Sequence, residues 1–191
     1  MNLRRAVLLV AALVFITTGM VLYRSDAVRD TTTARDYEPG LPADSAELVA
    51  MVVGKYRPEF SLPDVAGQLR HISEWDGQVV TLNFWATWCL PCLKEVPELV
   101  DLQARFGSQG LQIVGIALQR PEELGGFIAE NKMNYPVLAG EAAVIVVAEL
   151  YGNTVGVLPY TAIINRTGEI VFTRAGPVTG AEVEAVISKL L

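Results

Sequence analysis

Cysteine and histidine are scarce in this chain of 191 residues, which has two cysteines and a single histidine. A closed zinc site needs four ligands, so Cys89, Cys92 and the distant His71 do not suffice for one. The chain also lacks a basic stretch. Its 15 Lys and Arg are outnumbered by 21 Asp and Glu, which gives a net charge of −6. We therefore expect no metal site and no nucleic-acid partner.

A long hydrophobic run occurs only at the N-terminus. Residues 6–22 carry no charge, and 17 helical residues span about 26 Å, near the short limit for a transmembrane helix. Arg4 and Arg5 precede the run, which predicts a cytoplasmic N-terminus with the remainder exported. A cleaved signal peptide is the alternative, but its apolar region is usually shorter, and residues 25–27 are the only nearby candidate for a cleavage site. We expect an uncleaved anchor at residues 1–23.

The remaining chain divides into a linker at residues 24–55 and a folded domain at residues 56–191. Hydrophobic periodicity and turn residues predict the elements of this domain. They are a hairpin (60–62 with 68–70), a helical turn (73–76), strands (79–85, 111–118), an extended piece (135–138), a second hairpin (161–165 with 169–173), and helices (89–106, 122–132, 142–151, 181–191). Residues 144–147 would also suit a strand. This order implies an α/β fold with a mixed sheet and helices on both faces.

The two cysteines bracket the first turn of the helix that follows the strand 79–85. Any disulfide within one molecule must join Cys89 to Cys92, and this spacing brings two sulfurs within bonding distance. Cys89 would lie at the helix N-terminus, where free N–H groups and the helix dipole stabilise a thiolate, the attacking species. Inert packing cysteines or a purely structural disulfide are the alternatives, although so short a loop adds little stability. The pattern favours thiol–disulfide exchange, with Cys92 as the resolving thiol.

Three parts of the sequence resemble the thioredoxin superfamily, and within it the membrane-anchored TlpA/ResA-type thiol–disulfide oxidoreductases. They are Phe84-Trp-Ala-Thr-Trp-Cys-Leu-Pro-Cys92, then Pro97, then Gly156-Val-Leu-Pro-Tyr-Thr161. The resemblance covers residues 56–191 and implies a thioredoxin-like domain with an additional N-terminal hairpin. The N-terminal anchor and this hairpin favour the TlpA/ResA type over soluble thioredoxin.

The resemblance also implies roles for residues outside the cysteine pair. Pro159 matches the family's cis-proline, which lies opposite the cysteines and leaves the backbone of Leu158 to pair with an extended client chain. Without the resemblance, a trans bond would be the expectation. Trp88 and Tyr160 are expected to line the same client groove, and no cofactor is expected.

Glu95 lies three residues after Cys92 and matches an acid of the TlpA/ResA-like proteins. Its carboxylate would move the proton of the Cys92 thiol. The alternative is an exposed helix glutamate that only interacts with the helix dipole. Soluble thioredoxins carry a buried aspartate where this chain has Asn83. Because an amide is not a base, proton transfer must differ here, and Glu95 becomes the stronger candidate.

We therefore expect a single-pass protein of the inner (cytoplasmic) membrane, with its catalytic domain on the periplasmic side, that reduces disulfides in exported proteins. The resemblance implies an integral membrane thiol electron donor and clients of cytochrome c maturation or copper-site assembly. One alternative is a Cu(I)-binding assembly factor that uses Cys89 and Cys92, although a well-placed third ligand is lacking. Another is a peroxide reductase, but Trp85 or Ala86 stands where its Thr-x-x-Cys signature needs threonine.

Overall fold

The computed structural model describes residues 52–191, so the expected anchor and most of the expected linker lie outside the described part. No helix within residues 52–191 is long and apolar enough to cross a membrane. The N–H of Gly54 donates to the carbonyl of Ile170 (2.8 Å), and the N–H of Ile170 donates to the carbonyl of Lys55 (2.9 Å). The last two residues of the expected linker are therefore bound to the folded domain.

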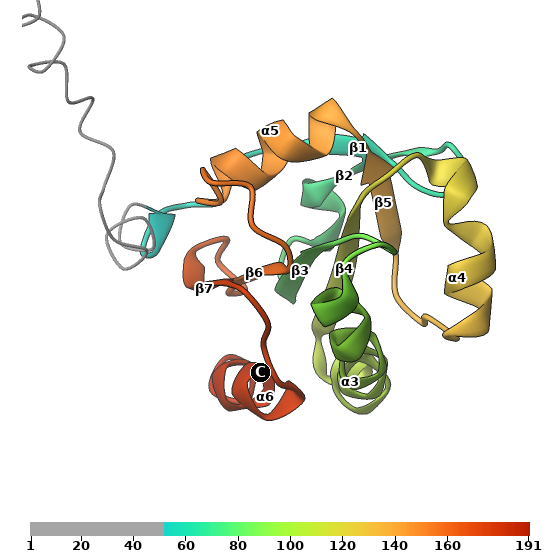
Figure 1. Ribbon diagram of the computed structural model, residues 1–191. Coiled ribbons are helices and arrows are strands. Elements are labelled where there is room, and N and C mark those ends of the chain that lie inside the picture. Colours follow the sequence, from blue (N-terminus) through green and yellow to red (C-terminus); the bar gives the residue numbers. More distant parts are fainter. Residues whose placement is uncertain (1–51) are drawn as a thin grey trace, which may run out of the picture. The chain divides into compact units, whose positions relative to one another are not determined.

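A five-stranded mixed sheet forms the centre of the domain (Figure 1). In spatial order its strands are β5 (Val137–Gly140), β4 (Leu111–Leu118), β3 (Val79–Trp85), β6 (Tyr160–Ile164) and β7 (Ile170–Ala175). β3 pairs parallel with β4 and antiparallel with β6, β4 pairs parallel with β5, and β6 pairs antiparallel with β7. β3 is buried along its whole length, as a nearly continuous apolar run predicts for a central strand.

Helices cover both faces of this sheet, as the sequence predicts. In Figure 1, α3 (Leu90–Phe106) and α6 (Gly180–Ile187) lie on one side of the sheet and α5 (Ala142–Leu150) on the other. The first side buries one apolar cluster, which includes Trp85 and both cysteines. The second side buries another, which includes Phe84 and Tyr160. The cysteine pair therefore lies on the α3 side of the sheet, within the first of these two apolar clusters.

The remaining elements are short. The N-terminal hairpin of β1 (Ser61–Pro63) and β2 (Leu69–His71) forms as predicted, and the 3₁₀ helix η1 (Ile72–Trp75) follows it. A second 3₁₀ turn, η2 (Gly107–Gln109), continues from the end of α3. The predicted helix 142–151 forms as α5. The alternative of a strand at residues 144–147 is therefore wrong.

The predicted helix 122–132 is wrong in its extent. It consists of a 3₁₀ turn, η3 (Pro121–Glu123), followed by the short helix α4 (Gly125–Glu130). Two consecutive glycines begin α4, and glycine is a poor helix former because of its backbone freedom. Lys132, with a φ of 50°, lies in the left-handed region and ends the segment.

The C-terminal helix is shorter than the predicted 181–191 as well. Thr179 and Glu182 form a capping box that fixes its start at Gly180. At its other end, the Ser188 hydroxyl donates to the Glu184 carbonyl (2.7 Å). The last turn then tightens, because the N–H of Leu190 donates to the carbonyl three residues earlier (2.9 Å). These local bonds end α6 at Ile187.

Candidate active site

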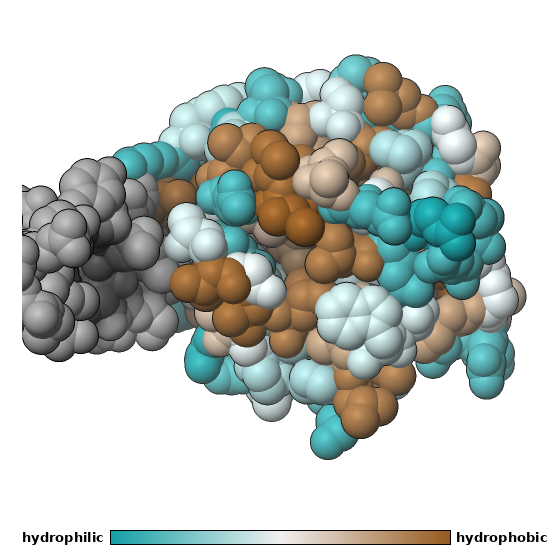
Figure 2. Space-filling view, turned by 45° about the horizontal axis from the view of Figure 1, so that its top comes forward, coloured by the Kyte–Doolittle hydropathy of each residue, from teal (hydrophilic) through white to brown (hydrophobic). Residues whose placement is uncertain are grey.

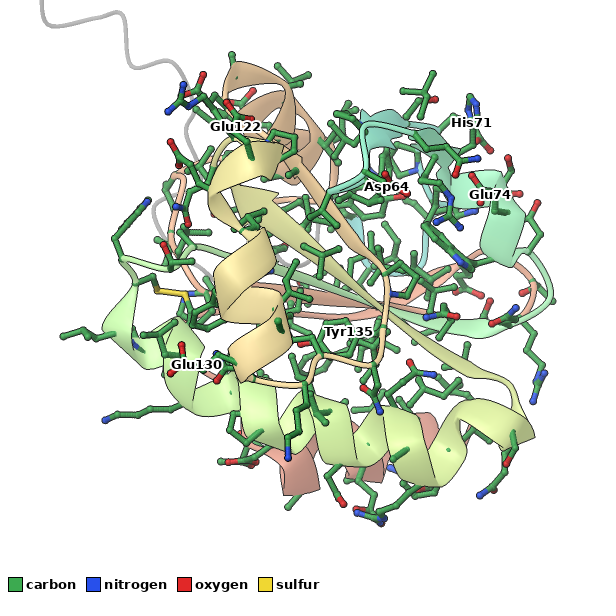
Figure 3. The ribbon with its side chains drawn as sticks, turned by 90° about the vertical axis from the view of Figure 1, so that its right-hand side faces the viewer. Asp64, His71, Glu74, Glu122, Glu130 and Tyr135 are labelled. Carbon is green, nitrogen blue, oxygen red and sulfur yellow. A yellow bond between two sulfur atoms is a disulfide. The ribbon has the colours of Figure 1, made fainter. Side chains whose placement is uncertain are left out.

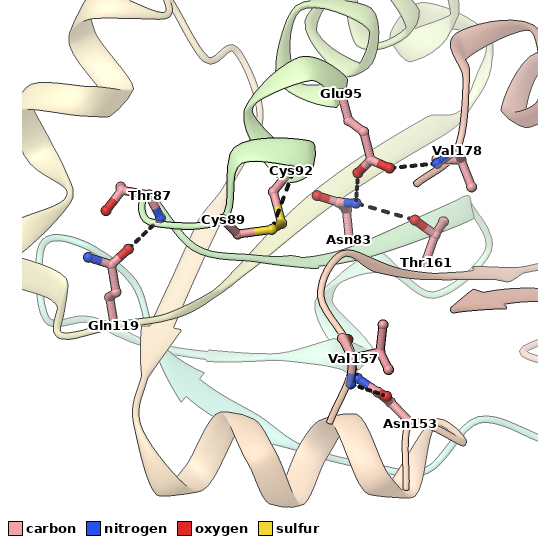
Figure 4. Close-up of a disulfide and its surroundings, with 10 residues drawn as sticks. All are labelled: Asn83, Thr87, Cys89, Cys92, Glu95, Gln119, Asn153, Val157, Thr161 and Val178. Carbon is pink, nitrogen blue, oxygen red and sulfur yellow. Dashed lines mark hydrogen bonds between the residues drawn. A yellow bond between two sulfur atoms is a disulfide. The ribbon is translucent and has the colours of Figure 1, made fainter. Parts of the chain in front are cut away.

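The cysteine pair lies where the central strand ends and α3 begins (Figure 4). Cys89 and Cys92 are joined by a disulfide, with their Cα atoms 5.3 Å apart. Cys89 is the N-cap of α3, and its sulfur accepts a hydrogen bond from the N–H of Cys92 (3.3 Å). Pro91 occupies the first turn, where its missing N–H costs no hydrogen bond. The N–H of Cys92 in the first turn of α3 is thus directed at the sulfur of Cys89.

The two cysteines differ in accessibility. Cys89 retains 6% of its residue surface, whereas Cys92 retains none. Cys89 is therefore the more accessible of the two residues to an incoming thiolate or disulfide. This asymmetry matches the predicted division into an attacking Cys89 and a resolving Cys92.

Glu95 belongs to a buried polar network behind the disulfide (Figure 4). Its side chain is 2% exposed, so the alternative of an exposed helix glutamate is wrong. One carboxylate oxygen accepts from the N–H of Val178 (2.6 Å), and the other accepts from the Asn83 amide (3.0 Å). The same amide also donates to the hydroxyl of Thr161 (3.2 Å). Val178 and Asn83 thereby hold the carboxylate of Glu95 directly, and Thr161 holds Asn83. Glu95 itself lies one helical turn after Cys92.

Burial raises the pKa of Glu95 above its ordinary value of 4.5. The hydrogen bonds from Val178 and Asn83 favour the charged form and oppose this effect, while the neighbouring charge of Glu98 adds to it. A carboxyl group with a raised pKa, one helical turn along the chain from a thiol, is suited to accept and return a proton. Sequence analysis identified Glu95 but could not identify Val178 as its partner, because the two are 83 residues apart.

The loop opposite the disulfide contains the proline singled out in the sequence. The peptide bond between Leu158 and Pro159 is cis, as the resemblance implies. Leu158 packs against the apolar cluster on the α3 side of the sheet, whose members include both cysteines. The roles of Leu158 and Pro159 in client binding remain predictions.

The side chain of Tyr160 is buried in the core. It is 2% exposed, and its hydroxyl donates to the carbonyl of Tyr151 (2.8 Å). Its ring packs edge-on against Phe84 on the α5 side. The alternation of side chains along β6 places Tyr160 on this side of the sheet, and its role in client binding stays a prediction.

The two tryptophans of the motif have different environments. Trp85 is fully buried and packs against Phe127, with 5.1 Å between the ring centroids. Trp88 is 63% exposed and immediately precedes Cys89, and its contact with a client stays a prediction. The loop between them is fixed by Gln119, whose side-chain oxygen accepts from the N–H of Thr87 (2.6 Å). No sequence motif indicated this contact.

The single histidine lies far from the cysteine pair. His71 ends β2, and its ring Nδ1 lies 2.7 Å from the hydroxyl of Ser61 across the hairpin. Figure 3 shows the labelled His71 at the hairpin and the yellow disulfide near the opposite end of the domain. Within residues 52–191, no group of three or more His, Cys, Asp or Glu side chains is arranged to hold a metal ion.

Comparison with known proteins assigns the fold and the chemistry. The AhpC/TSA family model matches residues 53–173. The chain belongs to the AhpC/TSA family. Thiol-disulfide oxidoreductase ResA of Geobacillus kaustophilus is 30% identical over 139 residues, 72% of this chain and 78% of the relative. ResA of Halalkalibacterium halodurans is 32% identical over 132 residues, 69% of this chain and 73% of the relative.

A solved structure agrees with these members of the family. The thiol:disulfide interchange protein of Chlorobium tepidum, a thioredoxin family protein, superimposes with a TM-score of 0.65 at 25% identity, covering 72% of this chain and 96% of that one. The predicted thioredoxin-like fold is therefore confirmed, and so is the predicted class of enzyme: the chain is a thiol–disulfide oxidoreductase that resembles ResA.

Proposed function

We propose that this oxidoreductase acts as a reductase of disulfides in exported proteins. The observation that carries the proposal is the asymmetric pair, in which Cys89 caps the N-terminus of α3 and retains some accessible surface while Cys92 is completely buried. Such a pair attacks through one sulfur and resolves through the other. Proline before the second cysteine also resembles reducing members of the superfamily more than strong oxidants.

The exchange proceeds in two steps. The Cys89 thiolate attacks the client disulfide, a bond forms between Cys89 and one client sulfur, and the second client sulfur leaves as a thiolate that takes up a proton. The Cys92 thiol then loses its proton and attacks the sulfur of Cys89, which releases the first client sulfur as a thiol. The client gains two electrons and two protons, and the enzyme is left with the Cys89–Cys92 disulfide.

Glu95 is the proton acceptor for the second step in this proposal. Its carboxylate is held by Val178 and Asn83 on the buried side of the pair, where water has little access. Cys92 is equally buried, so its proton needs a nearby acceptor within the protein. The raised pKa of Glu95 reduces the cost of carrying that proton between the two steps.

We further propose that residues 1–23 anchor the protein in the inner membrane with its catalytic domain on the periplasmic side. The uncharged run at residues 6–22 and the preceding Arg4 and Arg5 support this orientation. An oxidising compartment requires a source of electrons, so an integral membrane thiol carrier is the proposed donor. Clients of cytochrome c maturation or copper-site assembly are proposed from the resemblance to TlpA/ResA-type proteins.

Two experiments test the proposal. Alkaline phosphatase fused after residue 50 should be active if the domain is exported, and inactive fusions would contradict the localisation. A Cys92→Ser variant should accumulate a mixed disulfide between Cys89 and its client in the membrane fraction, which mass spectrometry identifies. The matched Cys89→Ser variant should trap nothing. Equal trapping by both variants would contradict the assigned roles.

A further inference from the structure

The loop that leads to Pro159 is closed by a single buried amide (Figure 4). Asn153 is 2% exposed, its side-chain nitrogen donates to the carbonyl of Val157 (2.8 Å), and its side-chain oxygen accepts from the N–H of Val157 (3.0 Å). Two backbone bonds complete the loop: the N–H of Asn153 donates to Ala148 (2.9 Å) and that of Gly156 donates to Asn153 (3.3 Å). The amide thus pairs with Val157 as a neighbouring strand would.

This pairing has a consequence for the residues on either side. Both polar backbone groups of Val157 are already bonded within the protein, so they are not available to an incoming client chain. Leu158 is the next residue, and it is the one expected to pair with the client. The side chains of Val155 and Val157 remain 67% and 38% exposed at the surface of the loop.

The same loop forms one wall of an apolar cavity. The cavity has a volume of about 120 Å³, and Gly156 and Leu158 line it from the loop while Ile145 and Ala148 line it from α5. Asn153 also lines it, but both ends of its amide are engaged by Val157, so no polar group in it lacks a partner. A cavity of ~150 Å³ lined by aliphatic and aromatic side chains accommodates benzene, so this one suits an aliphatic side chain.

Leu158 links the cavity to the predicted path of the client chain, because it lines the cavity and is the residue expected to pair with the client. This residue packs against the cluster that contains both cysteines and also against the cluster that contains Ala148. Exposed apolar side chains surround the region: Ile145, Val146 and Leu150 on α5, Val155 and Val157 on the loop. Figure 2 shows apolar side chains gathered on the face of the molecule that carries α5. A client cysteine bonded to Cys89 would place its own neighbouring residues on this surface.

We propose that Asn153 is a positioning residue that determines client specificity: it holds residues 153–158 so that the cavity admits an aliphatic side chain beside the client's reactive cysteine. The inference rests on the proposed exchange with protein clients but not on the direction of electron flow. Burial of a leucine side chain contributes about 1.5–3 kcal/mol, and each 1.4 kcal/mol is a factor of ten in affinity. Clients with leucine beside the cysteine should therefore bind at least about tenfold better than those with glycine.

The test compares two synthetic peptides, each carrying one cysteine in a disulfide with glutathione, flanked on both sides by leucine or by glycine. The reduced full-length protein should show a KM about tenfold lower for the leucine peptide. Asn153→Ala should raise the KM for the leucine peptide more than the KM for the glycine peptide, so that the tenfold preference is lost, and should leave the reduction potential unchanged. Equal effects on both peptides, or a shifted potential, would show a merely structural role and overturn the proposal.

Two further variants make the outcome decisive. Asn131→Ala removes another amide that bonds a backbone carbonyl, that of Phe127 (2.9 Å), and should behave as the unmodified protein. Ala148→Met fills the cavity without changing Asn153 and should abolish the preference for leucine. Retained preference in Ala148→Met would rule out the cavity as the binding site. A strongly oxidising potential with the preference intact would contradict the reductase proposal alone, because the same preference is measurable in the reverse reaction.

Discussion

The sulfur of Cys89 accepts a hydrogen bond from the backbone N–H of Cys92, over 3.3 Å. The same two residues are joined by their disulfide. In the reduced protein we expect this N–H and the positive end of the helix dipole to face a Cys89 thiolate. The helix therefore stabilises the attacking form of Cys89 and leaves Cys92 without comparable support.

The first prediction concerns the reactivity of the two thiols. In the reduced protein at neutral pH, iodoacetamide should modify Cys89 at least about a hundredfold faster than Cys92, because Cys89 is the more accessible residue and is the N-cap of α3. Mass spectrometry of the peptides over time measures both rates. In Cys89→Ser, the remaining thiol should stay unmodified unless the protein is denatured. Rapid modification of Cys92 in the folded protein would contradict the assignment.

The second prediction concerns stability and pH. Because the folded protein holds a proton on Glu95 above the ordinary pKa of 4.5, the folded state binds more protons than the unfolded one in the range just above that value. The contribution of Glu95 to stability is therefore largest below pH 4.5 and falls as the pH rises through its raised pKa. Urea unfolding across pH 4–8 should show this fall in the unmodified protein.

The control for this prediction is Glu95→Gln, which lacks the titrating group and should lose that part of the pH dependence. Glu98→Gln provides a matched variant one turn further along α3, where the carboxylate accepts from the N–H of Gly180. If Glu95 moves the proton of Cys92, its replacement should slow the second step of exchange by ~10²-fold or more, and replacement of Glu98 should not. Identical pH profiles for resolution in all three proteins would exclude Glu95 from proton transfer.

The third prediction restores the aspartate of soluble thioredoxins. Asn83→Asp replaces the amide donor to Glu95, 3.0 Å away, by a second buried carboxyl group. Two carboxylates at this distance cannot both be charged, so the pair should hold a proton at neutral pH. We expect a loss of about 2–4 kcal/mol in the free energy of unfolding at pH 7 and a smaller loss at pH 4.5. An unchanged stability at pH 7 would mean that the Asn83 bond contributes nothing.

The fourth prediction concerns the support of Trp85. A Cβ atom at Gly115, the partner of Asn83 on β4, would lie 3.0 Å from the indole nitrogen of Trp85 and 3.3 Å from the ring of Tyr135. Gly115→Ala should therefore destabilise the domain by ~1–3 kcal/mol through overpacking. Thermal unfolding measures the loss, and Gly126→Ala, which meets nothing within 4 Å, is the matched control.

The sequence predicted the parts of the fold and site that follow from local patterns. The burial of β3, the helix N-terminus at Cys89 and the hairpin of β6 and β7 each depend on residues close together in the chain. The sequence predicted one helix where residues 121–130 form a 3₁₀ turn and a short α-helix. The helical spacing of the surrounding apolar residues outweighed the Gly125-Gly126 pair in that prediction. Periodicity also could not show that β6 turns Tyr160 into the core.

The contacts that the sequence did not reveal join distant segments. Val178 binds Glu95 from 83 residues away, and Gln119 binds Thr87 from 32. The sequence also did not reveal the bonds between Asn153 and Val157, although the two residues are close in the chain. These bonds depend on the path of the loop and not on a motif. Each of these contacts positions a group that the sequence did identify, and each follows from tertiary packing alone.

The reduction potential of the Cys89–Cys92 pair tests the central claim most directly. The full-length protein in detergent would be equilibrated with glutathione or dithiothreitol, and its redox state read from the fluorescence of the tryptophans, two of which lie beside the pair. The reductase account predicts a value near or below that of thioredoxin, about −270 mV. A value near −120 mV, that of a strong oxidant, would contradict the reductase account and identify a disulfide donor. If no reversible couple were found, Cu(I) binding would be the alternative to test.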